Sequence, residues 1–555
     1  MPVHATQIIS LLVLGLLLVF PVACAPSGQL TPSLPEAEAN KGPQRGGKLS
    51  LVGSITGPGH NDLQLVITNA GRDWAVPVVN GLLKRDIYDS NYPIVGDLAK
   101  SWDISADGLT YTLKLHQGVK WQNIPPVNGR EFTSEDAKYS LLRMAADPSI
   151  VPEKDKPKFQ RQLDFAPIKG IDTPDKYTAV LHLKEPMIPL LDAVSHAASG
   201  MAPKELVDEQ GGIITNKMIG TGPFMVADYR QDQAVQYKRN PEYWQKGLPH
   251  LDELSMLRFA DIQAELAAFR SFQLDIPGTG HTKTAVDTLK RNMPDIKVKS
   301  DTPRLAVRNF RFNMKFAPFQ DLRVRRAIHL AIDRETFLEV GAEGLGYVAG
   351  AVTPMYKDVA NPSEWILSQP GYRKDKSQDI AEAKRLMAEA GYSDGLNFSI
   401  LVSNSSAMTD AAALLADQLK PLKINMKTDV EEYAIWLGRS NQGNFELSHM
   451  SHTMNADADS VLSAHIHSKG GRNYGKFSDP ILDDLIDKQR RTANIEERRR
   501  LVQEAEKRVM EQAPLVFLYV ANSILVTQPW VNDFTIGTVP GDQFLSLPKA
   551  WVEKR

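Results

Sequence analysis

The chain has 555 residues, of which 42% are hydrophobic and 8% aromatic, a globular composition that excludes an intrinsically disordered protein. Its 64 basic and 66 acidic residues give a net charge of −2. This excludes the strongly basic balance of nucleic-acid-binding proteins, so no nucleic-acid partner is predicted. The one cysteine, Cys24, excludes an internal disulfide and metal sites built from several cysteines.

The N-terminal residues have the pattern of a targeting segment. Residues 8–20 are almost wholly apolar, but this run is shorter than the about 20 residues that a membrane-spanning helix needs. Residues 1–23 are therefore predicted to be a secretory signal peptide. The small residues before Cys24 resemble the processing site of bacterial lipoproteins, in which the cysteine is lipidated; the alternative is a plain signal with a chance cysteine. Residues 24–46, with four prolines, are predicted to be a lipid anchor and flexible tether that hold the protein outside the cytoplasm.

The first half of the body alternates strand and helix patterns. The pattern predicts strands over Lys48–Val52, Gly108–His116 and Tyr177–Leu183 and a short helix over Val78–Leu83. Thr133 is predicted to cap a helix over residues 134–144, because Asp136 stands at the third helical position and can close a capping box.

The second half continues the alternation. One long helix is predicted over residues 322–340 after Asp321, and others over 378–390, ended by Gly391, and over 495–512 after Asn494. Leu515–Val520 predicts a fully buried strand. Because helices and strands are intermixed throughout, the fold class is predicted to be α/β or α+β.

Several sequence blocks, taken in this order, resemble the extracytoplasmic solute-binding proteins of peptide and nickel importers, known as family 5. The blocks are Leu98–Trp102, Ser105–Lys114 and Gly118–Trp121; then Gly220–Phe224 and Lys238–Trp244; then Ala317–Phe319, Arg323–Arg325 and Ala331–Arg334; and last the terminal helix with its LVFLYV strand. The resemblance covers about residues 47–555. Most of these blocks are interpreted as scaffold, and Gly220 and Gly222 are expected to flank a tight turn with positive φ.

The resemblance implies an α/β fold of the two-lobed periplasmic-binding-protein type (type II), with a ligand cleft between the lobes and an additional inserted domain. Lobe I is then expected to comprise residues 47–84, 205–300 and 516–555; the insert, 85–204; and lobe II, 301–515. Closing the two lobes would sequester a small ligand.

The resemblance also implies a ligand-binding loop over Phe445–Asp459. Its acidic position, which pairs with a peptide's amino group in the family, is Asn455 here. Because an amide gives no counter-charge and an unpaired buried ammonium is costly, the usual grip on a free amine is in doubt. Asp457 and Asp459 are the alternative acids, unless they are solvated loop carboxylates that cap the next helix.

Aromatic and basic side chains complete the predicted ligand site. Tyr433 and Trp436 are candidates for an aromatic wall, although one of them is expected to face the core instead. Arg439 resembles a position that binds a ligand carboxylate, or it is an exposed arginine at a helix end. The remaining candidates are Arg72 and Trp74, which follow the first strand, and Arg308, on the strand leading to lobe II.

Four histidines, His449, His452, His465 and His467, lie within nineteen residues. They allow two interpretations, a transition-metal site or separate histidines that form hydrogen bonds with a polar ligand. The second is preferred, with His449 and His452 in the ligand site, and neither a metal nor a cofactor is predicted.

The sequence contains no recognised catalytic motif that would supply a nucleophile together with its base, so an enzyme is not expected. The resemblance implies a monomeric lipoprotein that captures a short peptide or peptide-like ligand and delivers it to the ABC permease and ATPase subunits of an importer. Two alternatives stay open: a binding protein for an oligosaccharide or a metal chelate, and a peptide-sensing surface lipoprotein without a transport role.

Overall fold

The computed structural model describes residues 42–53, 62–65, 72–159, 161–215, 217–453 and 455–554, and of His452 and Thr453 it describes only the backbone. The chain divides into two compact units, residues 1–42 and 43–555, and the elements below belong to the second. Cys24, the predicted signal peptide and the tether up to residue 41 lie outside the described residues, so these predictions stay untested. Within the described ranges, no helix has both the length and the apolar character needed to cross a membrane.

The first sheet, which we call the N-terminal sheet, has the strand order β1-β10-β9-β8. Its strands are β1 (Lys48–Val52), β8 (Phe224–Arg230), β9 (Ala234–Arg239) and β10 (Glu253–Leu257), followed by the helices α6 (Ile262–Arg270) and α7 (Lys283–Asn292). β1 confirms the predicted first strand, and it pairs in parallel with β10. Leu49 and Leu51 of β1 are buried in the core.

The second sheet, which we call the insert sheet, is antiparallel with the order β4-β5-β7-β6. Its strands are β4 (Ala99–Ile104), β5 (Thr110–Leu115), β6 (Ile168–Asp175) and β7 (Thr178–Leu183), and the helices near it are α2 (Ser134–Met144), α3 (Gln162–Phe165), α4 (Leu190–Ser195) and α5 (Lys204–Glu209). The predicted strands and the predicted helix of this region are confirmed. The backbone N–H of Thr133 donates to the Asp136 carboxylate at 2.9 Å, which closes the expected capping box.

The predicted helix over Val78–Leu83 is wrong. The segment leaves a turn after Val78 and enters the short strand β2 (Leu83–Arg85), which pairs with β3 (Ile94–Gly96) in a two-stranded sheet. The Val78 carbonyl accepts a hydrogen bond from the backbone N–H of Gly222 at 2.8 Å, so a distant partner takes the backbone group that a helix would use.

The third and largest sheet, which we call the large sheet, has the order β12-β16-β11-β15-β13-β14. Its strands are β11 (Lys297–Phe312), β12 (Gly346–Val348), β13 (Leu396–Ser403), β14 (Ile424–Glu431), β15 (Leu447–Thr453) and β16 (Leu515–Thr527). Its helices are α8 (Ala317–Gln320), α9 (Leu322–Ala331), α10 (Arg334–Ala342), α11 (Ser363–Ser368), α12 (Ser377–Glu389), α13 (Ser406–Gln418), α14 (Tyr433–Gln442), α15 (Asp459–Val461), α16 (Pro480–Arg491) and α17 (Ile495–Gln512). The chain ends with a small sheet of β17 (Val531–Asn532) and β18 (Trp551–Val552).

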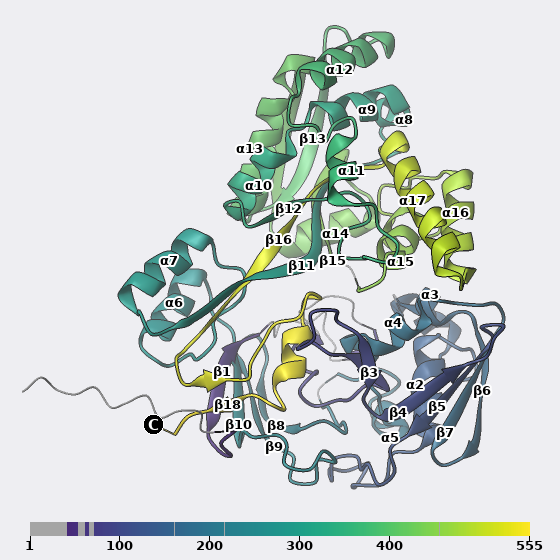
Figure 1. Ribbon diagram of the computed structural model, residues 1–555, viewed down its shortest axis with the longest axis vertical. Helices are drawn as coiled ribbons and strands as arrows, with labels where there is room; N and C mark the ends of the chain where they lie inside the picture. Colours follow the sequence, from purple (N-terminus) through teal and green to yellow (C-terminus); the bar gives the residue numbers. More distant parts are fainter. Residues whose placement is uncertain are drawn as a thin grey trace, which may run out of the picture. The chain divides into compact units, whose positions relative to one another are not determined.

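Two long strands connect these regions. β11 and β16 run side by side from α6 and α7 to the helices of the large sheet (Figure 1), and they pair from Lys297↔Thr527 to Arg311↔Leu515 with three register shifts. The predicted lobe boundaries at residues 300 and 515 therefore fall inside β11 and at the start of β16. The structure thus joins the two regions through paired strands, and the exact lobe boundaries stay a proposal.

The single helix predicted over residues 322–340 is wrong in one respect, because it is two helices, α9 and α10. Ile332 is extended, and the Asp333 carboxylate accepts hydrogen bonds from the backbone N–H groups of Glu335 and Thr336, which starts a new helix. The other helix ends are as predicted: Gly391 has φ +88° after α12, and the Asn494 side chain accepts from the Glu497 N–H at 3.0 Å at the start of α17.

The expectation of positive φ at Gly220 and Gly222 is also wrong, since neither has it. A Cβ atom at Gly220 would lie 2.0 Å from the Val78 carbonyl oxygen, and one at Gly222 would lie 2.5 Å from the same carbonyl group. Glycine is needed here because two backbone segments approach each other too closely for a Cβ atom to fit between them.

Candidate functional site

The candidate site is a cavity of about 630 Å³ between the segment that precedes α7 and the large sheet, a volume typical of sites for small ligands. We call it the main cavity. It receives side chains from β11, α14, β15 and β16, which include Arg304, Arg308, Tyr433, Trp436, Ser451 and Asn522, together with Thr279–Lys283, His465, Arg472 and Tyr474 from the connecting segments.

Two arginines on β11 reach the main cavity because of the strand's alternation. Arg304, Ala306 and Arg308 line it, whereas the intervening Leu305 and Val307 are buried in the core on the other face of the sheet. Arg308 is opposite Ser451 of β15, which also lines the main cavity. Arg308 was predicted from the sequence. Arg304 was missed, although its spacing of four residues from Arg308 on one strand is the signal that would have found it.

The helix α14 supplies the aromatic side chains. It begins after Glu432, whose carboxylate accepts from the Ala434 N–H at 2.8 Å, and its first turn carries Tyr433 and Trp436. Their ring centroids are 5.4 Å apart, and both rings line the main cavity. Tyr433 is 54% exposed and Trp436 only 5%, so Trp436 also packs in the core and Tyr433 is the more accessible to a ligand.

Arg439, one turn further along α14, does not line the main cavity. Its guanidinium forms ion pairs with Asp429 at 2.8 Å and Glu431 at 2.6 Å, both on β14. Its carboxylate partners are thus supplied by the protein itself, and its role in ligand binding stays a prediction without support from this geometry.

A second cavity has a volume of about 210 Å³ and shares the lining residue Arg472 with the main cavity. We call it the side cavity. It contains two predicted site residues, Arg72 and Asn455. An Arg72 Nη atom lies 3.5 Å from the Nε2 atom of His196. Burial and the nearby guanidiniums, Arg161 first, hold the pKa of His196 well below its ordinary value, so that this imidazole is neutral.

The other predicted residues lie outside both cavities. Trp74 is buried in the core and packs against Tyr229, with ring centroids 5.1 Å apart. Asp457 forms an ion pair with Arg498 at 2.6 Å, and Asp459 forms one with Arg490 at 3.2 Å. The alternative is wrong in that neither carboxylate is left to solvent, since both are engaged with arginines of α16 and α17. Its capping part holds for Asp457, whose carboxylate accepts from the Asp459 backbone N–H at 2.8 Å at the start of α15.

The histidines are not gathered at one point. His465 lines the main cavity, whereas His467 lies 3.5 Å from Asp487 and lines the side cavity. The side chain of His452 lies outside the described residues; its backbone pairs with Val307. In the described ranges, no group of three His, Cys, Asp or Glu side chains is arranged to hold a metal ion.

His449 is 3% exposed, on the same strand as Ser451 and next to the ring of Phe310, with centroids 5.1 Å apart. In the part of the chain that the structure describes, neither of its ring nitrogens has a hydrogen-bond partner. Burial, and secondarily the charge of Arg308, lower the pKa of His449 from 6.5 to about 3. The imidazole is therefore neutral at physiological pH.

This pKa predicts an acid-dependent loss of stability. Between about pH 6.5 and about pH 3 the unfolded chain binds a proton that folded His449 does not, so its stabilising contribution is complete above this range and falls as the pH falls. From about pH 7 to about pH 5, the free energy of unfolding of the wild type should drop by about 2 kcal/mol more than that of His449→Phe. Urea unfolding at both pH values measures this.

His182→Phe, which replaces a partly exposed histidine of β7, is the control for the substitution of histidine by phenylalanine outside the core. If His449→Phe and the wild type lose stability in parallel on acidification, then His449 is not held neutral by its surroundings.

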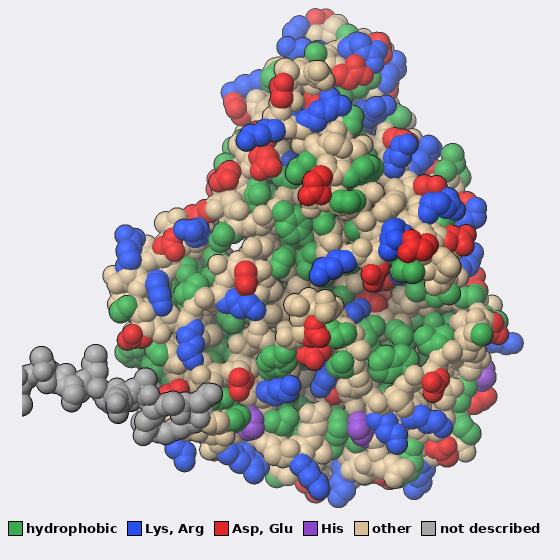
Figure 2. Space-filling view, in the orientation of Figure 1, with side chains coloured by type: hydrophobic (Ala, Val, Ile, Leu, Met, Phe, Trp, Pro, Cys, Tyr) green, Lys and Arg blue, Asp and Glu red, His purple; other side chains and the backbone are tan. Residues whose placement is uncertain are grey.

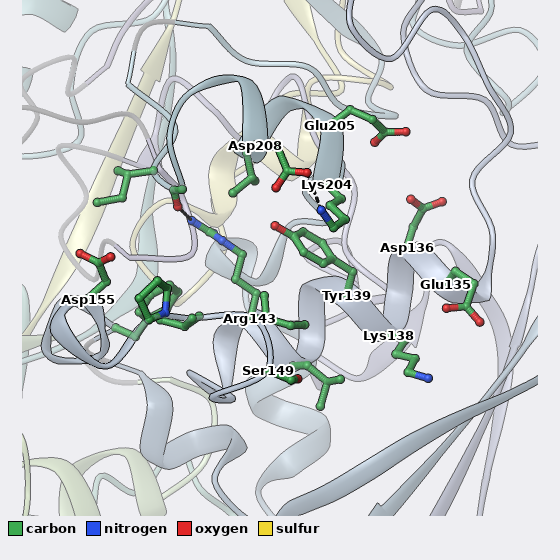
Figure 3. A pocket seen from close by; sticks show the side chains of 18 of the residues that line it. Glu135, Asp136, Lys138, Tyr139, Arg143, Ser149, Asp155, Lys204, Glu205 and Asp208 are labelled. Atoms are coloured by element: carbon green, nitrogen blue, oxygen red, sulfur yellow. Dashed lines mark hydrogen bonds and ion pairs between the residues drawn. The ribbon is translucent and has the colours of Figure 1, made fainter.

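A further cavity, of about 780 Å³, lies between α2 and α5 (Figure 3). Three of its four basic side chains have carboxylate partners: Arg130 contacts Asp136 and Glu205, Arg143 contacts Asp62, and Lys204 contacts Asp208. These pairs neutralise three of the four basic charges, the fourth being that of Lys138, and none of the predicted ligand residues lines this cavity. We therefore place the candidate site at the main and side cavities.

Comparisons with known proteins identify the family and the fold. Residues 93–473 match the family described as Bacterial extracellular solute-binding proteins, family 5 Middle. The periplasmic oligopeptide-binding protein OppA of Escherichia coli K12 is 26% identical over 496 residues, which are 84% of this chain and 85% of that protein.

Two solved structures are similar over 92% of this chain and 99% of theirs. They are the periplasmic binding protein DppA of Helicobacter pylori in complex with the peptide STSA (24% identity, TM-score 0.79) and AgaA of A. tumefaciens R10 in complex with agropinic acid (25% identity, TM-score 0.76). The predicted fold class is confirmed: the chain has the α/β, two-lobed, type II fold of periplasmic binding proteins.

Proposed function

The chain belongs to the bacterial extracellular solute-binding proteins of family 5, and from this premise we propose that it is the substrate-binding protein of an ABC importer. In this proposal it captures a short peptide or peptide-like ligand in the main cavity and delivers it to permease and ATPase subunits. The observation that carries the proposal is that one cavity of about 630 Å³ is lined by Arg308, Tyr433 and Trp436. A guanidinium beside two aromatic rings suits a ligand with both acidic and apolar parts.

The proposal extends to the organisation of the chain. Lobe I comprises residues 47–84, 205–300 and 516–555, lobe II comprises 301–515, and the insert is 85–204, with closure of the lobes retaining the ligand. The chain acts as a monomer outside the cytoplasm and is anchored through lipidated Cys24. Catalysis has no part in this function, because a solute-binding protein releases its ligand unchanged.

The test begins with the ligand that the purified protein carries. We expect native mass spectrometry to reveal a co-purified small molecule, and a panel of short peptides, oligosaccharides and metal chelates to identify the class that raises the melting temperature. Tyr433→Ala should weaken binding of the best probe about tenfold, because it removes an exposed ring from the cavity wall.

Ile435→Ala is the matched control. Ile435 lies on the same helix and is 53% exposed, but it does not line the main cavity, so its loss should leave affinity unchanged. Equal affinities of Tyr433→Ala and Ile435→Ala would contradict the placement of the site. A protein that carries no ligand and binds none of the panel would contradict the function itself.

A further inference from the structure

The main cavity has an unbalanced charge, unlike the outer surface. Charged side chains of both signs are interspersed over the face seen in Figure 2. The side chains that line the main cavity include four cationic ones, Lys283, Arg304, Arg308 and Arg472, and one acidic one, Glu343. Lys283 already pairs with Asp287 at 2.6 Å, so the excess of positive charge comes from the arginines. The Glu343 carboxylate accepts a hydrogen bond from the backbone N–H of Thr284 at 2.8 Å, near the start of α7. One of its two oxygens therefore already has a hydrogen-bond donor.

Arg304 and Arg308, both on β11, belong to this positive region. Across the described ranges, neither guanidinium lies within ion-pair distance of a carboxylate; Arg308 lies beside the neutral hydroxyl group of Tyr519. Burial lowers the pKa of Arg304, the positive charge of Arg308 lowers it further, and Asp73 opposes this only in part. Two half-buried cations that repel each other are costly unless an anion joins them.

The same region offers little to a cationic ligand. Asn455 of the side cavity is neutral, and the nearby acids Asp457 and Asp459 form ion pairs with Arg498 and Arg490. Moving either carboxylate to a ligand's ammonium group would leave an arginine without its partner, which is unfavourable away from bulk water.

We propose, on the basis of the proposed function, that the ligand class is an acidic, peptide-like molecule with at least two carboxylates and no free amino group. Its carboxylates bind at Arg304 and Arg308, where the planar guanidinium can donate two parallel hydrogen bonds to a carboxylate. Its apolar part lies against Tyr433 and Trp436. The selectivity thus follows from the sign of the charge on β11.

Calorimetry with matched probes tests this class. The probes are N-acetyl-Asp-Glu, its neutral counterpart N-acetyl-Asn-Gln-amide of nearly the same shape, and the cationic N-acetyl-Lys-Lys-amide. The full chain, freed of any co-purified ligand, should bind the acidic probe at least about tenfold more tightly than the neutral one. This preference should weaken at high salt, because salt screens charges.

Arg308→Gln should lose most of the preference. Arg326→Gln, which removes the same charge from an exposed position of α9, should keep it. Arg308→Lys should give an intermediate preference, since it keeps the charge without the planar fork. The free energy of unfolding of each variant shows that it is folded.

Three results would contradict the proposal, each at a different point. If the neutral or cationic probe binds as tightly as the acidic one, the proposed charge class is wrong while the proposed function stands. If Arg308→Gln binds the acidic probe like the wild type, the assignment to this pair of arginines is wrong. If no probe binds, the acidic class fails together with the peptide-like ligand of the proposed function.

Discussion

Asp62→Ala is expected to lower the free energy of unfolding by about 3–5 kcal/mol, the usual cost of removing one partner from a buried ion pair. The side chains of Asp62 and Arg143 are 0% and 1% exposed. Both Nη atoms of Arg143 donate to the Asp62 carboxylate, and they also donate to the Gln64 side-chain oxygen and the Gly212 carbonyl. With alanine at position 62, the guanidinium stays buried without its counter-charge.

Urea unfolding at neutral pH measures the loss, and Asp208→Ala is the matched control. Asp208 pairs with Lys204 on α5, but both side chains are about 60% exposed, so this change should cost less than about 1 kcal/mol. The double variant Asp62→Ala/Arg143→Met should recover part of the stability, because it removes the orphaned charge. A cost for Asp62→Ala no larger than that for Asp208→Ala would show that the ion pair does not hold α2 to the segment after β1.

This ion pair also shows where sequence reasoning stops. Asp62 follows the first strand in the sequence without any pattern that marks it, yet it is fully buried against Arg143, 81 residues further along the chain. Similarly, Asp457 and Asp459 stand two residues apart, while the arginines that neutralise them come from α16 and α17. No local sequence pattern indicates which distant residue will pair with a given acid.

Local patterns succeeded where the physical cause is itself local. The alternation in β5, the capping box at Thr133 and the side-chain cap at Asn494 each depend on residues within a few positions. The predicted site residue Arg439 forms an intermediate case. The partners of Arg439, Asp429 and Glu431, alternate on one strand, but only the structure places that strand beside α14.

Gly220→Ala is expected to lower the free energy of unfolding by about 3 kcal/mol, at the upper end of the range for overpacking. The new Cβ atom would lie 2.0 Å from the Val78 carbonyl oxygen, and no change of side-chain rotamer can relieve a clash with a backbone atom. The Gly220 carbonyl also accepts from the backbone N–H of Gln122 at 2.9 Å. A backbone shift that removes the clash would therefore strain this hydrogen bond as well.

The control is Gly170→Ala, on β6 of the insert sheet. A Cβ atom there meets nothing within 4 Å, and its φ is not positive, so the change should alter stability by less than about 1 kcal/mol. Urea midpoints and melting temperatures of both variants separate the two cases. If Gly220→Ala is as stable as Gly170→Ala, the close approach of this segment to Val78 is not rigid. Close packing of two backbone segments would then not explain the glycines of the Gly220–Phe224 block. Positive φ would not explain them either, because neither Gly220 nor Gly222 has it.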